Sequence, residues 1–251
     1  MRILVTNDDG IHGPGLVALE NIARAISDDV WVVAPDEERS GAGHSLTLSN
    51  PLRYRQIEKR RFEVSGTPTD CVVMAVRKIM PALPDLILSG VNRGSNIADD
   101  VTYSGTIAAA MEGTQLGIKS IAMSQITGMY GNGESFAVAE KYGEQIVRKL
   151  IAMEFSPGVL MNVNYPDCRP DEVAGIDVTM QGKRDQNFLL VDERKDGRGN
   201  PYYWIGFARE RGNPPAGTDI AAVFNKRVSI TPLHMNLTQI DALEALRLVF
   251  K

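Results

Sequence analysis

Two adjacent carboxylates, Asp8 and Asp9, follow a short apolar run at the start of this chain, MRILVTNDDG. Residues 3–6 have the composition of a buried strand, and Gly10 predicts a turn directly after the acidic pair. Adjacent carboxylates repel each other, and a hard divalent cation such as Mg²⁺ or Mn²⁺ relieves that repulsion. The pair therefore indicates a metal site, although an acidic turn that faces solvent would have the same composition.

Two further clusters of small and polar residues follow predicted strands. The first is RSGAGHS at 39–45, where Ser40 offers a hydroxyl that could ligate a metal. The second is SGVNRGSN at 89–96, which comes directly after the apolar run PDLIL and supplies Asn92 and Asn96. Asparagine carbonyls are hard oxygen ligands, and backbone N–H groups in such loops bind phosphate oxygens. Each cluster alone could also be an ordinary linker or turn.

A fourth cluster, Ser104-Gly105-Thr106, opens the predicted helix TIAAAMEG. The unpaired N–H groups at a helix start attract phosphate, although simple capping would also explain Ser104. Two carboxylates, one hydroxyl and one amide oxygen would leave positions open on an octahedral cation. Water and a substrate phosphate oxygen could fill those positions. The four clusters together predict metal-assisted chemistry on a phosphate.

Several function classes find no support in the sequence. The chain lacks the GxxxxGK[ST] loop, and its first strand–helix turn reads DDGIHGPG instead of GxGxxG. A net charge of −4 argues against DNA or RNA binding. The two cysteines form neither a disulfide framework nor a zinc site, and no apolar run reaches 18 residues. We expect a cytoplasmic protein with no export signal and no membrane span.

The elements that must position these clusters alternate along residues 1–165. Strands are predicted at 3–6, 30–34, 86–88, 120–123 and 159–163, and helices at 15–26, 69–80, 105–116 and 135–154. A hairpin is predicted over 52–57 and 62–64. This alternation predicts an α/β fold, a Rossmann-like three-layer core with a mostly parallel sheet and right-handed crossovers. Ligands of such sheets bind at the carboxyl ends of the strands, where the polar clusters lie.

The pattern changes after about residue 170, within what we expect to be a single domain over residues 1–251. Strands are predicted at 177–180, 202–207 and 228–231, and a helical turn at 218–224. The polar stretch 181–200 predicts an exposed excursion, either a β-hairpin arm or a flexible loop. A closing helix at 237–250 has apolar residues at helical spacing and must dock, either on its own domain or on a neighbouring subunit.

Taken together, the motifs of this chain resemble the SurE family of metal-dependent 5′/3′-nucleotidases. The motifs are NDDG at 7–10, RSGAGHSLTL at 39–48, GTPTDCV at 66–72, SGVNRGSNIADDVTYSGTIAAAMEG at 89–113 and TPLH at 231–234. The resemblance implies hydrolysis of nucleoside monophosphates, with one divalent cation held by Asp8, Asp9, Ser40 and Asn92. It implies a phosphate pocket of Asn96, Ser104, Gly105 and Thr106. It also implies a homodimer or homotetramer with exchanged C-terminal segments.

Two positions depart from the common pattern of that family. Arg93 stands where a small residue is frequent, and Ser95 stands where proline is frequent. Arg93 either adds positive charge near the phosphate or faces solvent.

The hypothesis is direct attack of water on the phosphorus, with Asp8 or Asp9 orienting or deprotonating that water. A covalent aspartyl-phosphate is the rival mechanism, although such enzymes usually space their carboxylates as DxD. Exopolyphosphatase activity could accompany the main reaction. Two other functions remain open on the residues alone, namely a non-catalytic nucleotide or metal sensor and a dinucleotide-dependent enzyme of similar fold.

Overall fold

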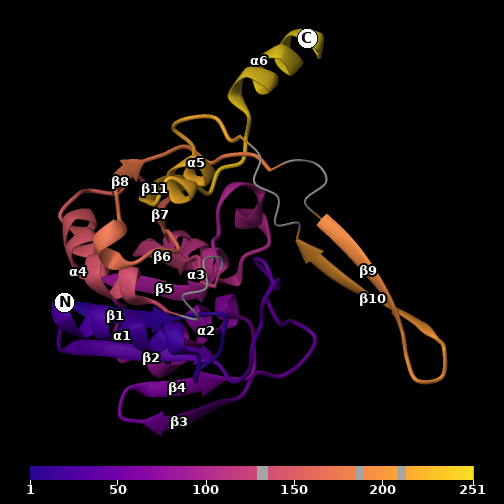
Figure 1. The fold of residues 1–251 in the computed structure, drawn as a ribbon. Helices are drawn as coiled ribbons and strands as arrows, with labels where there is room; N and C mark the ends of the chain where they lie inside the picture. The colour runs from indigo at the N-terminus through magenta and orange to yellow at the C-terminus, as the bar shows by residue number, and fades with distance from the viewer. Residues whose placement is uncertain (129–134, 185–188, 208–212, 251) are drawn as a thin grey trace.

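The computed structural model describes residues 1–128, 135–184, 189–207 and 213–250. Its centre is a nine-stranded sheet with the order β3-β4-β2-β1-β5-β6-β7-β11-β8 (Figure 1). The central strands β2, β1, β5, β6 and β7 are parallel. The sheet strands are β1 (Arg2–Thr6), β2 (Asp29–Pro35), β3 (Tyr54–Glu58), β4 (Arg61–Val64), β5 (Leu86–Arg93), β6 (Lys119–Gln125), β7 (Val159–Tyr165), β8 (Gly175–Val178) and β11 (Arg227–His234).

Helices cover both faces of this sheet. On one face α1 (Pro14–Ile26) packs beside α4 (Ala137–Ile151), and on the other face α2 (Pro68–Met74) packs beside α3 (Gly105–Gln115). The remaining elements of the core are the short helices η1 (Ala75–Ile79), η2 (Ala98–Thr102), η3 (Pro170–Glu172) and α5 (Asp219–Phe224). The predicted three-layer α/β fold with a mostly parallel sheet is confirmed.

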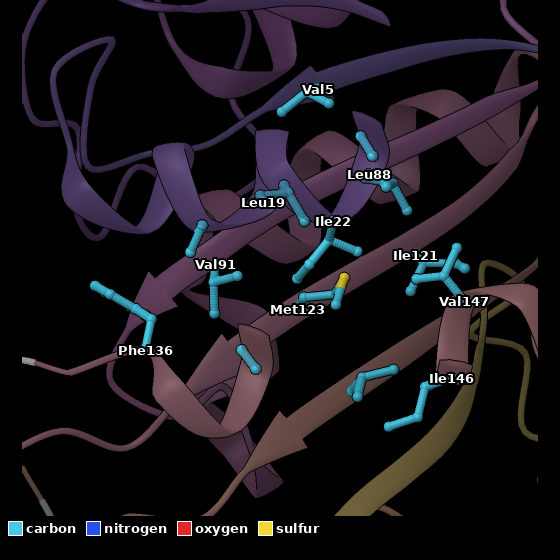
Figure 2. Packing of buried hydrophobic residues seen from close by; sticks show 14 of the residues in the cluster. Val5, Leu19, Ile22, Leu88, Val91, Ile121, Met123, Phe136, Ile146 and Val147 are labelled. Carbon is cyan, nitrogen blue, oxygen red and sulfur yellow. The ribbon is translucent and has the colours of Figure 1, made fainter. Parts of the chain in front are cut away.

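Alternation along β1 explains how one strand serves two apolar layers. Ile3 and Val5 join the cluster under α1 and α4, whereas Leu4 joins the cluster under α2 and α3. Successive side chains of a strand point to opposite faces, so a strand buried on both sides must be apolar throughout. Figure 2 shows the α1–α4 layer, where Leu19 and Ile22 of α1 lie over the sheet residues.

Strand β5 is longer than the sequence indicates. The apolar run predicts a strand over 86–88 and a loop over 89–96, but the strand continues through Arg93. Its pairing with β6 shifts register between Ser89 and Asn92, and Asn92 then pairs with Ser124. The bulge lies against α1 so closely that a Cβ at Gly15 would lie 1.9 Å from the Val91 carbonyl oxygen. The loop prediction for residues 89–93 is therefore wrong, because pairing with β6 carries the polar segment on as strand.

The C-terminal region differs from the core. Strands β9 (Leu189–Lys195) and β10 (Pro201–Phe207) form a separate antiparallel hairpin, here called the arm, which projects away from the sheet (Figure 1). The terminal helix α6 (Ile240–Val249) also stands away from the core and has no buried residue. The predicted hairpin arm is confirmed for its described residues, while 185–188 of the predicted excursion lie outside them. The prediction that the closing helix docks on its own domain is wrong, because no residue of α6 is buried in the single chain.

Candidate active site at the carboxyl edge of the sheet

The acidic pair lies where the sheet reverses its strand order. Strand β1 has β2 on one side and β5 on the other, and both neighbours run parallel to it. Thr6 at the end of β1 is in register with Ser89 of β5. The carboxylates that follow β1 and Asn92 near the end of β5 therefore share one edge, at the kind of switch point where open α/β sheets bind ligands.

Asp8 is a buried carboxylate with an unfavourable ionised form. It is 4% exposed, and the Thr106 hydroxyl donates a hydrogen bond to its Oδ1 at 2.5 Å. Burial raises the pKa of Asp8 to about 6, and repulsion from Asp9 adds to the rise, while the Thr106 hydrogen bond works against it. A cation near this pair would favour the ionised form of Asp8.

A tight turn brings Asp9 to the same edge. The Asn7 amide donates to the Gly10 carbonyl at 2.9 Å and closes the turn, and Asp9 Oδ2 accepts from the Arg93 backbone N–H at 3.2 Å. Adjacent residues of an extended strand would point to opposite faces. Because the chain turns here, Asp8 and Asp9 can both lie at the same edge of the sheet.

The Ser40 loop is tied to the same strand end. The Arg39 backbone N–H donates to the Asp8 carbonyl at 2.8 Å, which places the next residue beside the acidic pair. The Ser40 hydroxyl donates to Glu38 Oε1 at 2.9 Å, so its oxygen retains lone pairs for a ligand. The Asn92 amide nitrogen donates to the Gly94 carbonyl at 3.1 Å, so the carbonyl oxygen of this side chain is the acceptor that remains for a cation.

One cavity of about 530 Å³ brings most of the predicted residues together. Its wall includes Asp8, Ser40, Asn92, Asn96 and Ser104. Arg93 also lines it, with its guanidinium 3.8 Å from Glu38 Oε1, so this residue stands at the cavity mouth rather than fully in solvent. The volume lies in the range typical of small-molecule sites.

The start of α3 meets Asp8 from the other side. The Ser104 hydroxyl accepts from the Ile107 backbone N–H at 3.1 Å and caps the helix. A Cβ at Gly105 would lie 2.9 Å from the Asp8 Cβ, so only glycine permits this approach. Thr106 contacts Asp8 itself, because its hydroxyl donates the hydrogen bond to the Asp8 carboxylate.

Buried amides that the sequence reasoning did not single out hold Asn96 in place. Asn164 Oδ1 accepts from the Asn96 backbone N–H at 2.8 Å, and Asn162 Nδ2 donates to the Asn96 carbonyl at 2.8 Å. The Asn96 amide donates to the Ser124 hydroxyl at 2.8 Å. Asparagine is depleted in strands, so two amides at alternate positions of the run VLMNVNY were a signal that could have found them.

The donor set fits a hard cation. Among the residues that the structure describes, no group of three or more His, Cys, Asp or Glu side chains could hold a metal. The set at this edge instead comprises two carboxylates, a hydroxyl and an amide oxygen, all oxygen donors. Such sets suit Mg²⁺ or Mn²⁺, whereas zinc prefers nitrogen and sulfur.

Comparison with known proteins agrees with this geometry. A family model described as Survival protein SurE matches residues 3–188. The chain belongs to the SurE family. The resemblance predicted from the motifs is thereby confirmed, and the match covers Asp8, Ser40, Asn92 and Asn96.

Relatives in the SurE family match over the full chain. A protein of Parvibaculum lavamentivorans named 5′-nucleotidase SurE is 59% identical over 98% of this chain and 90% of its own length. A protein of Methylobacterium nodulans with the same name is 54% identical over 100% of both. The crystal structure of the SurE protein from Aquifex aeolicus superimposes with a TM-score of 0.84 at 40% identity and covers 100% of both chains. In the described part of this SurE family member, no helix is long and apolar enough to cross a membrane.

Proposed function

We propose that this protein is a divalent-metal-dependent 5′-nucleotidase that hydrolyses nucleoside 5′- and 3′-monophosphates to nucleoside and phosphate. The observation that carries the proposal is the convergence of Asp8, Asn92 and Asn96 on one cavity at the switch point of the sheet. Relatives at 54–59% identity bear the name 5′-nucleotidase SurE, which supports the same reaction.

One divalent cation, Mg²⁺ or Mn²⁺, would be held by Asp8, Asp9, Ser40 and Asn92. When bound, it would offset the negative charge of the phosphate and make a water molecule more acidic. The raised pKa of Asp8 supports this assignment, because a cation would offset the burial and the repulsion from Asp9 that disfavour the ionised form of Asp8.

The remaining residues of the edge would bind the phosphate. The Asn96 amide and the N-terminus of α3, formed by Ser104, Gly105 and Thr106, offer donors to phosphate oxygens. Thr106 would act chiefly through Asp8, because its hydroxyl already donates to that carboxylate. These residues would hold the phosphorus close to the acidic pair.

Water would then attack the phosphorus directly. The new P–O bond forms from water, the ester P–O bond breaks, and the nucleoside oxygen leaves with a proton. Asp8 or Asp9 would orient the water and accept its proton. In the rival aspartyl-phosphate mechanism a carboxylate oxygen first displaces the nucleoside, and water then displaces the carboxylate from the phosphorus. With a substrate made chiral at phosphorus by oxygen isotopes, inversion of configuration supports the single displacement of direct attack, and retention supports the two displacements of the rival.

Phosphate release tests the function itself. AMP, GMP and p-nitrophenyl phosphate should all yield phosphate with Mn²⁺ or Mg²⁺ and not with EDTA. Nucleotide binding without release would instead make the protein a sensor, and binding of NAD(P) would indicate a dinucleotide enzyme. Release of terminal phosphate from polyphosphate would add the exopolyphosphatase activity as a secondary reaction.

The exposed C-terminal elements support an assembly. We infer a homodimer or homotetramer that exchanges these segments, because Trp204 is 59% exposed and Leu248 is 71% exposed in the single chain. A cytoplasmic location remains the expectation, since Cys71 and Cys168 are free and buried.

A further inference from the structure

The cavity continues beyond the residues that the phosphate chemistry uses. Its wall also contains the rings of Tyr103 and Phe224, the aliphatic side chain of Ile126, and the ion pair of Arg184 with Asp100. A phosphate alone would leave this part of a 530 Å³ cavity empty. The wall therefore has the composition of a site for the other half of a substrate.

Arg184 is fixed in this wall by several contacts. Its backbone N–H donates to Asp99 Oδ2 at 2.6 Å, and its Nε donates to Asp100 Oδ1 at 2.7 Å. A second, shorter bond joins its Nη2 to Asp100 Oδ2, which makes the pair bidentate. Only 19% of the Arg184 side chain and 14% of the Asp100 side chain are exposed.

The segment that carries Arg184 is held just as firmly. The Gly182 backbone N–H donates to Asp219 Oδ1 at 2.8 Å, and Asp219 Oδ2 accepts from the Ala98 backbone N–H at 2.9 Å. The Gln181 amide donates to the Ala98 carbonyl at 2.9 Å. The chain just before the arm is thus attached to η2 (Ala98–Thr102), the turn that carries Asp100.

Two groups of residues in the cavity wall differ in charge. Asp8, which Asp9 follows directly, marks the part of the wall where the proposed cation would bind. Around Arg184 the Asp100 carboxylate neutralises the guanidinium, so this pair offers N–H donors without net charge, and the rings of Tyr103 and Phe224 add flat surface to the wall. An uncharged, flat ligand with polar edges fits such a wall better than a second phosphate does.

We propose that Arg184, held in place by Asp100, is a specificity-determining residue that recognises the nucleoside part of the substrate. The guanidinium would donate to acceptor atoms of the base or ribose while the rings of Tyr103 and Phe224 flank the base. This inference rests on the proposed nucleotidase function and adds the part of the site that separates nucleotides from other phosphate esters.

The test compares two substrates in two matched variants. AMP is compared with phenyl phosphate, whose leaving group has a ring but no base or ribose acceptors. Arg184→Met removes the guanidinium and keeps the length of the side chain. The matched control is Arg227→Met, because Arg227 makes an equivalent bidentate pair with Asp177, with bonds of 2.7 Å each, between β11 and β8.

Arg184→Met should raise the KM for AMP about tenfold, the effect of one lost hydrogen bond to a charged donor. The kcat/KM for phenyl phosphate should change less than twofold, and Arg227→Met should leave the ratio of the two substrates unchanged. An unchanged KM for AMP would overturn the inference. An equal loss for both substrates would also overturn it, because Arg184 would then act at the phosphate or on the whole fold.

Failure of the proposed nucleotidase function would give a different experimental result from failure of the inference about Arg184. If wild-type protein with Mn²⁺ releases phosphate from neither substrate, the nucleotidase proposal itself fails. If both substrates react and only the selectivity is insensitive to Arg184, the further inference alone fails. Should Arg184→Met not fold, Arg184→Lys keeps the charge and loses the bidentate fork, and the same selective rise in the KM for AMP is expected.

Discussion

The edge of the sheet around Asn96 and the C-terminal elements place polar and apolar side chains in opposite ways. At the edge, polar side chains are buried and hydrogen-bonded, as Asn162 and Asn164 are to the Asn96 backbone. In the arm and α6, large apolar side chains such as Trp204 and Leu248 are exposed. The amides around Asn96 find their partners within one chain, whereas the exposed apolar side chains of the arm and α6 do not. One chain therefore forms the cavity, whereas the exposed apolar side chains of the C-terminal elements would be covered only in the proposed assembly.

Removal of the divalent cation should give the largest loss of activity. This loss should involve the catalytic edge of the sheet and leave the arm and α6 unaffected. EDTA should reduce phosphate release from AMP to background, because Asp8 and Asp9 would lose the proposed cation and the phosphate its counter-charge. Mn²⁺ should restore release, and far-UV circular dichroism should stay unchanged throughout. Full activity in EDTA would contradict the metal assignment, and a change in assembled mass would show that the two regions depend on each other.

Asp8→Asn should lower kcat/KM at least about a hundredfold, since a lost ligand to the cation is worth several kcal/mol in the transition state. Without metal, the Asp8→Asn variant should nevertheless unfold at a temperature equal to or above that of the metal-free wild type. The sign follows from the raised pKa of Asp8: above pH 6 the folded chain must hold an ionised carboxylate that burial disfavours.

Activity and thermal unfolding of Asp8→Asn are measured side by side. Asp192→Asn on the exposed arm serves as the control and should change neither quantity. Retention of more than a tenth of the activity at limiting Mn²⁺ would contradict the role of Asp8.

Asn164→Leu tests whether buried polarity supports the phosphate end. The variant leaves the Asn96 backbone N–H without its acceptor, which costs about 1–3 kcal/mol in the free energy of unfolding. The KM for AMP should rise several-fold because Asn96 is no longer held, and kcat should change less.

The matched control for Asn164→Leu is Thr179→Val, which removes a buried hydroxyl bonded to Ser229 and Thr231 at 2.7 Å. It should lower stability without a change in KM. The same KM for both variants would reduce Asn164 to a general stabilising role.

The smallest effect on the catalytic edge is expected from the arm. The double variant Trp204→Ser, Ile205→Ser removes side chains that are 59% and 76% exposed, so the circular dichroism of the fold should be retained. Light scattering should show a lower mass than that of the wild type, since the partner surface is lost. Leu83→Ser, an exposed apolar residue outside the arm, is the control. An unchanged mass would contradict the proposal that the arm contributes to an assembly.

Much of the fold follows from local pattern. The alternation of apolar runs and helical periodicity predicts the strands and helices of the first 165 residues, because each layer must bury its own apolar face. Strand β11 was found as an element, but its antiparallel pairing with β7 was not predicted. Direction in a sheet depends on partners that are distant in the sequence.

The candidate site was predictable to the extent that its residues lie in short motifs. The carboxylate pair predicts oxygen ligands for a cation. The segment 89–106 predicts a further oxygen ligand and the start of a helix. Asn162 and Arg184 were missed for physical reasons. The amides of β7 are visible in the sequence, but the contact of Asn162 with Asn96, 66 residues away, is not. The charge of Arg184 resembles that of the other charged residues in this exposed segment, and only the structure shows its pair with Asp100, 84 residues away.

The contact between Gly15 and the carbonyl of Val91 limits how this fold can be recombined. Because a Cβ at Gly15 would lie 1.9 Å from that oxygen, the first helix and the bulge of β5 form one interlocking unit despite 75 intervening positions. Exchange of the first helix between relatives succeeds only where the donor also brings glycine at this position. The position of the bulge that ends in Asn92 therefore depends on a helix that carries none of the chemistry.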